Sequence, residues 1–108
     1  MSEIKDSYKT IKEPSEGFFK DRGSKFFGYA YPYTSEQELK AKIEELKKEH
    51  HTARHHCYAY RFKQDYSVYR ANDDGEPTNA AGKPILGQID AKDLTNVAVI
   101  VVRYFGGT

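Results

Sequence analysis

The stretch Val97-Ala98-Val99-Ile100-Val101-Val102 is the longest apolar run in the 108-residue chain. Four of its six residues are valine, and β-branched residues favour strands. A continuous apolar run of this length, opened by Asn96, is typical of a strand that is buried on both faces. A membrane-spanning helix needs about 20 apolar residues, so the run is too short for one. It therefore predicts the central strand of a sheet, in a chain long enough for one domain.

Two alternating segments precede this strand and predict a hairpin. His56–Lys63 alternates with a period of two, which places its two tyrosines on one face of a strand. Tyr66–Ala71 is expected to pair back on it through a turn at Gln64-Asp65. Between the hairpin and the central strand, Pro84–Ile89 predicts a short helix, because proline is favoured in a first helical turn.

One longer helix is predicted over Ser35–Glu49. Ser35 suits the N-cap position, and Glu38 follows at the spacing of a capping box. The apolar positions are spaced by four and three residues, so they form one stripe that should face the sheet. These positions are Leu39, Ile43 and Leu46.

The N-terminal third predicts further strands. Lys25–Tyr33 alternates with aromatic residues on one face, so it is expected to be a strand. Tyr8–Lys12 and Phe18–Lys20 are weaker strand candidates, and Glu13–Gly17 between them is expected to be a turn. Gly23 can supply the positive φ angle of the following reversal. The chain should therefore form a sheet of four or five strands.

Aromatic residues make up 14% of the chain, and two interpretations of them compete. They can pack across strands in the core, or they can form an exposed platform on which nucleic-acid bases stack. The core interpretation is favoured, because a small domain needs large apolar side chains. A net charge of +1, from 17 basic and 16 acidic residues, predicts no strong unspecific attraction to nucleic acid.

Cys57 is the single cysteine, so no disulfide framework can form. This fits a reducing, cytoplasmic setting, as does the lack of an apolar leader after Met1. Four histidines precede or adjoin Cys57, at His50, His51, His55 and His56. They invite a metal site, but no second cluster completes a ligand set. A polar, partly solvated helix end is favoured for the histidines, and a buried apolar role is favoured for Cys57.

The segment Asn72–Gly82 carries three carboxylates, at Asp73, Asp74 and Glu76. Neighbouring carboxylates can bind a hard cation or divide the roles of acid and base. Asp-Gly and Glu-Pro are also ordinary turn dipeptides, and this interpretation is favoured. The spacing is neither that of a calcium loop nor that of a Walker phosphate loop.

Arg103–Gly107 follows the central strand and also allows two interpretations. An arginine and two aromatic residues before paired glycines can bind phosphate and stack a base. The same residues can simply form the end of a strand and a turn. Since the chain stops six residues after Val102, we expect too few covering layers for a strand that is buried on both faces. We therefore expect a fragment that lacks at least one helix and that self-associates through the exposed face of this strand.

Taken together, the segments resemble the N-terminal domain of the Impact/YigZ family. The specific motifs are Asp-Asp-Gly-Glu-Pro at 73–77 and Arg-Tyr-Phe-Gly-Gly at 103–107. The other matching segments are Ala53–Tyr60, Ala81–Leu86, Asn96–Val102 and, more weakly, Gly23–Phe26. The family usually continues Glu-Pro with Ser-Gly-Thr-Ala-Gly, whereas this chain has Thr78-Asn79-Ala80-Ala81-Gly82. The family also continues with a further helix, and bacterial members add a ferredoxin-like domain, so 1–108 is expected to be a single, truncated domain.

The resemblance implies an α+β fold with a left-handed βαβ crossover and a sheet packed with two helices. This superfold is shared by a ribosomal protein domain and by domain four of elongation factor G. Eukaryotic relatives are translation regulators in amino-acid starvation, which compete for the activator of an initiation-factor kinase. We therefore expect a non-enzymatic regulator that binds a protein or the ribosome in the cytoplasm, without a cofactor, a metal or a membrane.

Two other hypotheses stay open at this stage: an RNA-binding module, and a metal-dependent enzyme that uses Asp73, Asp74 and Glu76. For the regulator, no catalytic residue is expected, and the binding residues should lie around the acidic loop. Arg103 is expected to pair with a carboxylate of this loop. The predicted binding residues are His55, Asp73, Asp74, Glu76, Arg103 and Tyr104.

Overall fold

The computed structural model describes residues 9–21, 23–53, 55–63, 65–74 and 82–104. It contains five strands and two helices within these ranges. The strands are β1 (Ser15–Asp21), β2 (Ser24–Tyr31), β3 (His55–Phe62), β4 (Val68–Asn72) and β5 (Val97–Tyr104). The helices are α1 (Glu36–Glu49) and α2 (Gly82–Ala91). No helix of the described ranges is long and apolar enough to cross a membrane.

The five strands form one sheet in the order β1-β2-β5-β3-β4, with antiparallel pairing at each junction. The apolar run Val97–Val102 lies in β5, which is the middle strand, so the predicted central strand is confirmed. β3 and β4 form the predicted hairpin. The predicted short helix is also present, and it is longer than the sequence indicated.

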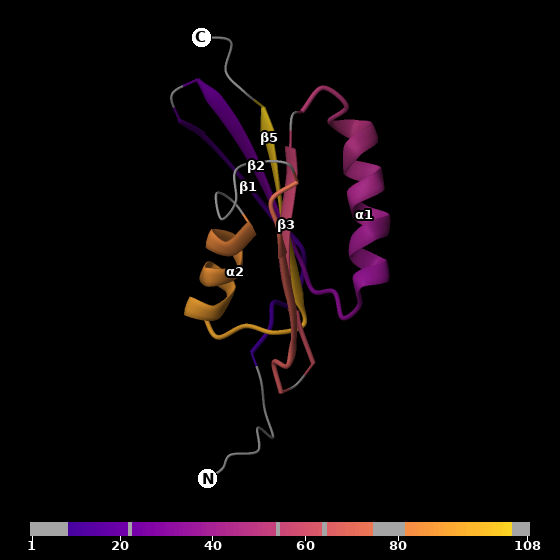
Figure 1. Cartoon of the computed structure of the whole chain (residues 1–108), viewed down its shortest axis with the longest axis vertical. Helices are drawn as coiled ribbons and strands as arrows, with labels where there is room; N and C mark the ends of the chain where they lie inside the picture. The colour runs from indigo at the N-terminus through magenta and orange to yellow at the C-terminus, as the bar shows by residue number, and fades with distance from the viewer. Residues whose placement is uncertain (1–8, 22, 54, 64, 75–81, 105–108) are drawn as a thin grey trace.

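The two helices lie on opposite faces of the sheet (Figure 1). Each helix connects two parallel strands that are two positions apart, β2 to β3 through α1 and β4 to β5 through α2. The strand direction, the direction of travel across the sheet and the face that carries the helix are all reversed between these two crossovers. Two crossovers related in this way have opposite hands, so one of them is left-handed, against the usual preference. The predicted α+β fold with a left-handed crossover is therefore confirmed.

The α1 face of the sheet holds the larger core. Ser35 caps α1 as predicted, with its hydroxyl accepting a hydrogen bond from the Glu38 amide. The predicted stripe Leu39, Ile43 and Leu46 is buried against the sheet. Most of the aromatic residues pack beneath it, and neighbouring rings stack. The buried aromatic residues are Tyr29, Tyr31, Tyr60 and Phe62. The core interpretation of these rings is confirmed, and they do not form an exposed platform.

The opposite face, which we call the α2 face, is covered less completely. Ile89 of α2 packs on Ala59 and Val97, which are fully buried. Further along β5, Val99 and Val101 are only half-buried. The prediction that β5 is buried on both faces is therefore right for the α1 face and for one end of the α2 face.

Two predictions for the N-terminal segment are wrong. Ser15–Gly17, expected as part of a turn, begins β1 because each of these residues pairs with a residue of β2. Lys9–Lys12, expected as part of a strand, forms only one isolated bridge, between Lys9 and Leu94. Pro14 lies directly before β1, at a position where it removes no hydrogen bond from the ladder. Gly23 has the expected positive φ angle, at 84°.

Candidate functional site

The acidic motif begins in a tight turn at the end of β4. The Asn72 side-chain oxygen accepts a hydrogen bond from the Asp74 amide at 2.8 Å, which is an Asx turn. Asp74 has a φ angle of 47°, in the left-handed region that aspartate tolerates better than most residues. The turn places Asp73 and Asp74 beside the start of β3. Glu76 lies outside the described residues.

Asp74 is bonded to two consecutive residues of β3. Its carboxylate oxygen Oδ2 accepts a hydrogen bond from the His56 amide at 2.6 Å. Its backbone carbonyl lies 2.7 Å from Nδ1 of His55. Because a carbonyl oxygen only accepts, His55 carries the proton on Nδ1 in this contact. The exposed side chain of Asp74 therefore fixes the turn to the neighbouring strand.

Asp73 holds the start of α2. Its Oδ1 accepts a hydrogen bond from the Gly82 amide at 2.7 Å, which satisfies one of the unpaired amides of the first helical turn. The Asp73 carbonyl accepts a bond from the buried thiol of Cys57 at 3.3 Å. Asp73 thus joins the end of β4 to the first residue of α2. The burial predicted for Cys57 is confirmed.

Gly82 is required by the close approach of α2 to β4. A Cβ atom at this position would lie 2.6 Å from the backbone nitrogen of Asn72 and 2.9 Å from its carbonyl carbon. Any larger residue would force the helix away from the strand. The glycine therefore brings the first turn of α2 within reach of the Asp73 carboxylate.

Arg103 lies next to this turn because of the sheet register. It stands directly opposite His55 in the β3–β5 pair. Its guanidinium group lies over the ring of Phe26, 5.4 Å from the centroid. The structure thus brings together four of the predicted binding residues, which we call the turn cluster. The turn cluster consists of His55, Asp73, Asp74 and Arg103. Its expected ion pair between Arg103 and a carboxylate stays a prediction.

Tyr104 belongs to the opposite face and is not part of the turn cluster. Successive residues of a strand point to opposite faces, so Tyr104 points to the α1 face. Its hydroxyl lies 2.6 Å from Nδ1 of His50, and Nε2 of His50 lies 2.7 Å from the Tyr29 hydroxyl. Burial raises the pKa of Tyr29 to about 12, and the negative charges of Glu49 and Glu16 add to the effect.

The histidines do not gather around one point. His50 is buried at the end of α1 between two tyrosines, so the expected solvated helix end is wrong for this residue. His56 is buried on the α1 face, while His55 and Cys57 lie on the α2 face. Within the described ranges, no three His, Cys, Asp or Glu side chains are grouped as metal ligands would be.

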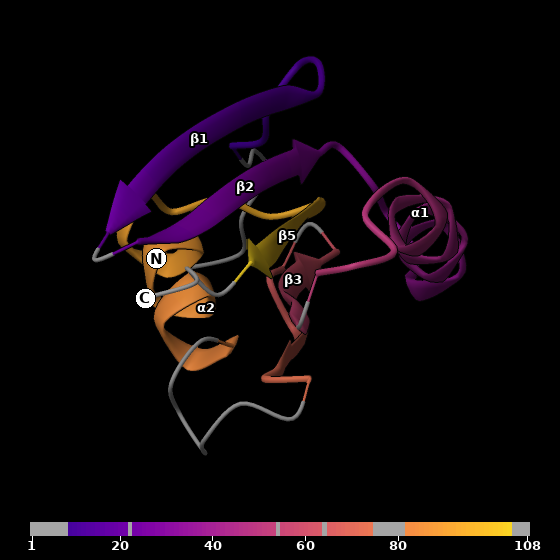
Figure 2. The same ribbon diagram turned by 90° about the horizontal axis from the view of Figure 1, so that it is seen from above.

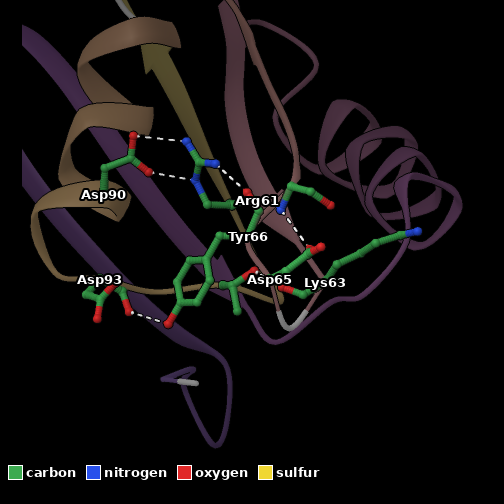
Figure 3. A network of polar contacts seen from close by, with 8 residues as sticks. Arg61, Lys63, Asp65, Tyr66, Asp90 and Asp93 are labelled. Carbon is green, nitrogen blue, oxygen red and sulfur yellow. Dashed lines mark hydrogen bonds and ion pairs between the residues drawn. The ribbon is translucent and has the colours of Figure 1, made fainter. Parts of the chain in front are cut away.

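A second polar site, which sequence reasoning missed, lies at the other end of the sheet (Figure 3). Arg61 donates from Nε and Nη2 to the two carboxylate oxygens of Asp90, at 2.7 and 3.1 Å, and from Nη1 to the Tyr66 carbonyl. Tyr66 in turn donates to the Asp93 carbonyl. A pocket of about 330 Å³ lies among these residues, Asp65 and Leu94. Arg61 and Asp90 are 29 residues apart, so no local signal could have joined them.

The second site is locked by its own contacts. Arg61 also lies over the ring of Tyr69, 4.4 Å from the centroid. Tyr66 and Asp93 have φ angles of 63° and 56°, which non-glycine residues rarely adopt. The three nitrogen atoms of the Arg61 guanidinium group all donate hydrogen bonds within the chain. The site therefore fastens α2 to the β3–β4 hairpin.

Comparisons with known proteins agree on one family. The family model of the Impact N-terminal domain matches residues 22–108. The IMPACT family member YvyE of Bacillus subtilis is 38% identical over 101 residues, which cover 94% of this chain and 46% of YvyE. The protein IMPACT homolog of Saccharomyces cerevisiae is 39% identical over 104 residues, which cover 88% of this chain and 40% of that protein.

Two solved structures share the fold. A crystal structure of a hypothetical protein aligns with a TM-score of 0.85 at 32% identity, over 92% of this chain and 49% of that one. The two-domain translational regulator Yih1 aligns with a TM-score of 0.63 at 32% identity, over 99% of this chain and 43% of Yih1. The chain thus spans about half the length of the relatives that it matches.

Proposed function

Because the chain belongs to the Impact N-terminal domain family, we propose that it regulates translation by binding a protein, without catalysing a reaction. Yih1, to which it is 32% identical, is described as a translational regulator. The proposal concerns the described domain, since the chain spans only part of these relatives. We include a cytoplasmic location in the proposal, because a chain with a single cysteine suits a reducing compartment.

The proposal rests on the hydrogen bonds that the two aspartates of the turn cluster accept from backbone amides. Oxygen atoms of Asp73 and Asp74 accept hydrogen bonds from the Gly82 and His56 amides. Carboxylates bonded in this way hold the ends of a loop in place, which a recognition loop needs. A catalytic or metal-binding carboxylate would instead direct its oxygens to a substrate or an ion, whereas one oxygen of each of these carboxylates is held by a backbone amide. The geometry therefore favours recognition over metal-dependent catalysis.

The surface composition favours a protein partner over RNA. The net charge is +1, whereas RNA-binding domains commonly carry a clear basic excess. The buried rings of Tyr29, Tyr31 and Tyr60 pack in the core on the α1 face, where nucleic-acid bases cannot reach them. The turn cluster carries both signs of charge, because Asp74 and Arg103 occur in it together. Such a surface fits a protein patch that also carries both signs. If the partner is the ribosome, we therefore expect the chain to contact a ribosomal protein.

The test compares two arginine variants in cells that express the chain. Arg103→Gln removes the positive charge of the turn cluster, and Arg70→Gln removes a charge from the exposed β4 edge, where Arg70 pairs with Glu36. We expect the parent chain to change amino-acid incorporation during starvation. Arg103→Gln should lose this effect and its co-purifying protein, while Arg70→Gln keeps both. The melting temperature of each purified variant separates lost binding from lost folding.

Two outcomes would favour the other hypotheses. If the chain binds RNA, and the affinity falls steeply as salt rises, phosphate contacts dominate and the RNA-binding hypothesis is favoured. If Mg²⁺ or Mn²⁺ binds at micromolar concentration and Asp73→Asn abolishes the binding, the enzyme hypothesis is favoured. An unchanged effect on translation in Arg103→Gln would exclude the turn cluster as the recognition surface.

A further inference from the structure

Strand β1 forms one edge of the sheet (Figure 2). None of the strands in the described ranges pairs with its outer side. The described side chains of β1 are all exposed, and its seven residues contain no proline. An edge of this kind presents a row of backbone amides and carbonyls that can pair with another strand.

The sequence of β1 is complementary to itself in the antiparallel direction. When two copies pair with Phe18 opposite Phe18 of the partner subunit, all seven residues are matched. Glu16 then stands opposite the partner's Lys20, and Lys20 stands opposite the partner's Glu16. Directly opposite side chains lie about 5 Å apart, within reach of an ion pair. The contact is isologous, so its twofold symmetry closes at two copies.

This register is singled out by charge and by length. Centring the pair on Gly17 sets Glu16 opposite Phe18 and leaves two residues of each copy unpaired. Centring it on Phe19 sets Lys20 opposite Phe18, with the same loss of pairing. Among these three registers, only the one centred on Phe18 sets Glu16 opposite Lys20 at both ends and matches the whole strand.

The monomer carries a charge conflict that this pairing relieves. Lys20 stands directly opposite Lys25 in the β1–β2 pair, and like charges in this position are destabilising. Among the ion pairs given by the described residues, neither Glu16 nor Lys20 takes part. The partner's Glu16 would supply the missing negative charge beside these two lysines.

Phe18 supports the same arrangement. One side of its ring contacts Phe27, with the centroids 4.9 Å apart, yet the residue is 53% exposed. In the proposed register the partner's Phe18 lies on the same face of the joined sheet and directly opposite. Aromatic pairs across neighbouring strands stabilise a sheet, and here they would cover surface that the monomer leaves in water.

We propose that two copies of this chain join through β1 as an antiparallel dimer, in which the two five-stranded sheets continue into one. This surface differs from the β5 face on which the sequence predicted self-association. It is also independent of the turn cluster, which lies across β3, β4 and β5. A contact made by two strands is smaller than a standard interface, so the dimer should be weak and should form only as concentration rises.

Sedimentation equilibrium of the whole chain over a wide concentration range tests the dimer. The parent chain should shift from monomer to dimer mass. Glu16→Lys sets like charges opposite each other at both ends of the strand pair, and it should weaken the dimer by about tenfold or more. Adding Lys20→Glu to this variant restores opposite charges and should restore the dimer. Glu44→Lys makes the same charge change at an exposed position of α1, and it should leave the dimer unchanged.

Three outcomes would overturn the proposal. The first is a parent chain that stays monomeric at every concentration. The second is a Glu16→Lys variant that dimerises like the parent, since the dimer would then use another surface. The third is a double variant that remains as weak as Glu16→Lys. Circular dichroism of each variant shows that a lost dimer does not come from a lost fold.

Discussion

The two faces of the sheet hold their helices in different ways. On the α1 face, large rings and three apolar helix residues form a continuous buried cluster. Tyrosine hydroxyls within it find partners on α1 or at its end, as Tyr29 does with His50 and Tyr60 does with Glu36. On the α2 face the core residues are small, such as Ala59 and Val97. There the helix is fastened near its two ends, by Asp73 and by Arg61.

This difference indicates how each face should respond to change. A cluster of interlocking rings cannot easily close around a hole, so a lost side chain leaves a cavity. For a helix that is held near its two ends, the packing depends more on those polar contacts than on the apolar area buried between them. The α2 face also carries the turn cluster, so its end contacts position the candidate site. The following predictions test this contrast.

The largest effect is expected from removing a buried side chain of α1. Leu39→Ala should lower the free energy of unfolding by about 4 kcal/mol, because Leu39 is fully buried among rings that cannot collapse around the cavity. Ile89→Ala on the α2 face should cost about 2 kcal/mol, because several apolar residues packed around it, such as Ile85 and Leu86, are only partly buried and can relax. Urea unfolding of both variants gives the comparison. A larger loss for Ile89→Ala would contradict the contrast.

The next effect is expected at the start of α2. Gly82→Ala should cost about 2 kcal/mol, because the added methyl group would meet the Asn72 backbone. Gly28→Ala is the matched control on the open part of the same face, where the nearest atom lies 4.0 Å away. That variant should be neutral or slightly stabilising, by up to about 1 kcal/mol. Thermal unfolding compares the two, and equal changes would show that the close approach does not limit α2.

The polar contacts of the α1 face predict a smaller effect. Tyr104→Phe removes the hydroxyl that lies 2.6 Å from Nδ1 of His50, and it should cost about 1.5 kcal/mol. Tyr69→Phe removes a hydroxyl from a residue that is 59% exposed, so it should have almost no effect. Urea unfolding at neutral pH measures both. A neutral Tyr104→Phe would mean that water replaces the lost contact.

The smallest effect concerns pH. Burial lowers the pKa of His56 below its ordinary value, and the positive charge of Lys47 adds to this, while Asp74 opposes it. The folded state therefore binds this proton less readily than the unfolded state, so stability should fall as pH drops below about 6.5. His56→Gln should flatten the decline in unfolding free energy between neutral pH and pH values near 5. His51→Gln controls for the loss of an exposed imidazole, and an unchanged decline in His56→Gln would contradict the assignment.

The buried tyrosines of the α1 face predict that the protein also loses stability at high pH. Burial raises the pKa of Tyr29, Tyr31 and Tyr60, so the folded state keeps their protons where the unfolded state loses them. These pKa values are raised, whereas the pKa of His56 is lowered, so stability is lost as the pH rises and not as it falls. This contribution to stability is complete below about pH 10 and is lost as the pH rises toward the folded values. Tyrosinate absorbance during a pH titration should therefore rise in two stages, with these buried residues ionising last.

Local patterns determined much of the fold. The capping residues and the apolar spacing of Ser35–Glu49 specify a helix without any distant contact, because each interaction joins residues three or four apart. The run Val97–Val102 predicts a strand because β-branched side chains favour the extended backbone. The family motifs also pointed to Asp73, Asp74 and Arg103 before their positions were known.

Only the tertiary structure decided how these pieces meet. Ser15–Gly17 looks like a turn in sequence, and it becomes a strand because β2 supplies partners for its backbone. His50 is buried because tyrosines 21 residues before it and 54 residues after it close over the helix end. Arg103 joins the turn cluster, and Tyr104 does not, because a strand alternates its faces and the register sets Arg103 opposite His55. Local sequence specifies the elements, whereas the pairing of distant strands determines which side chains share a site.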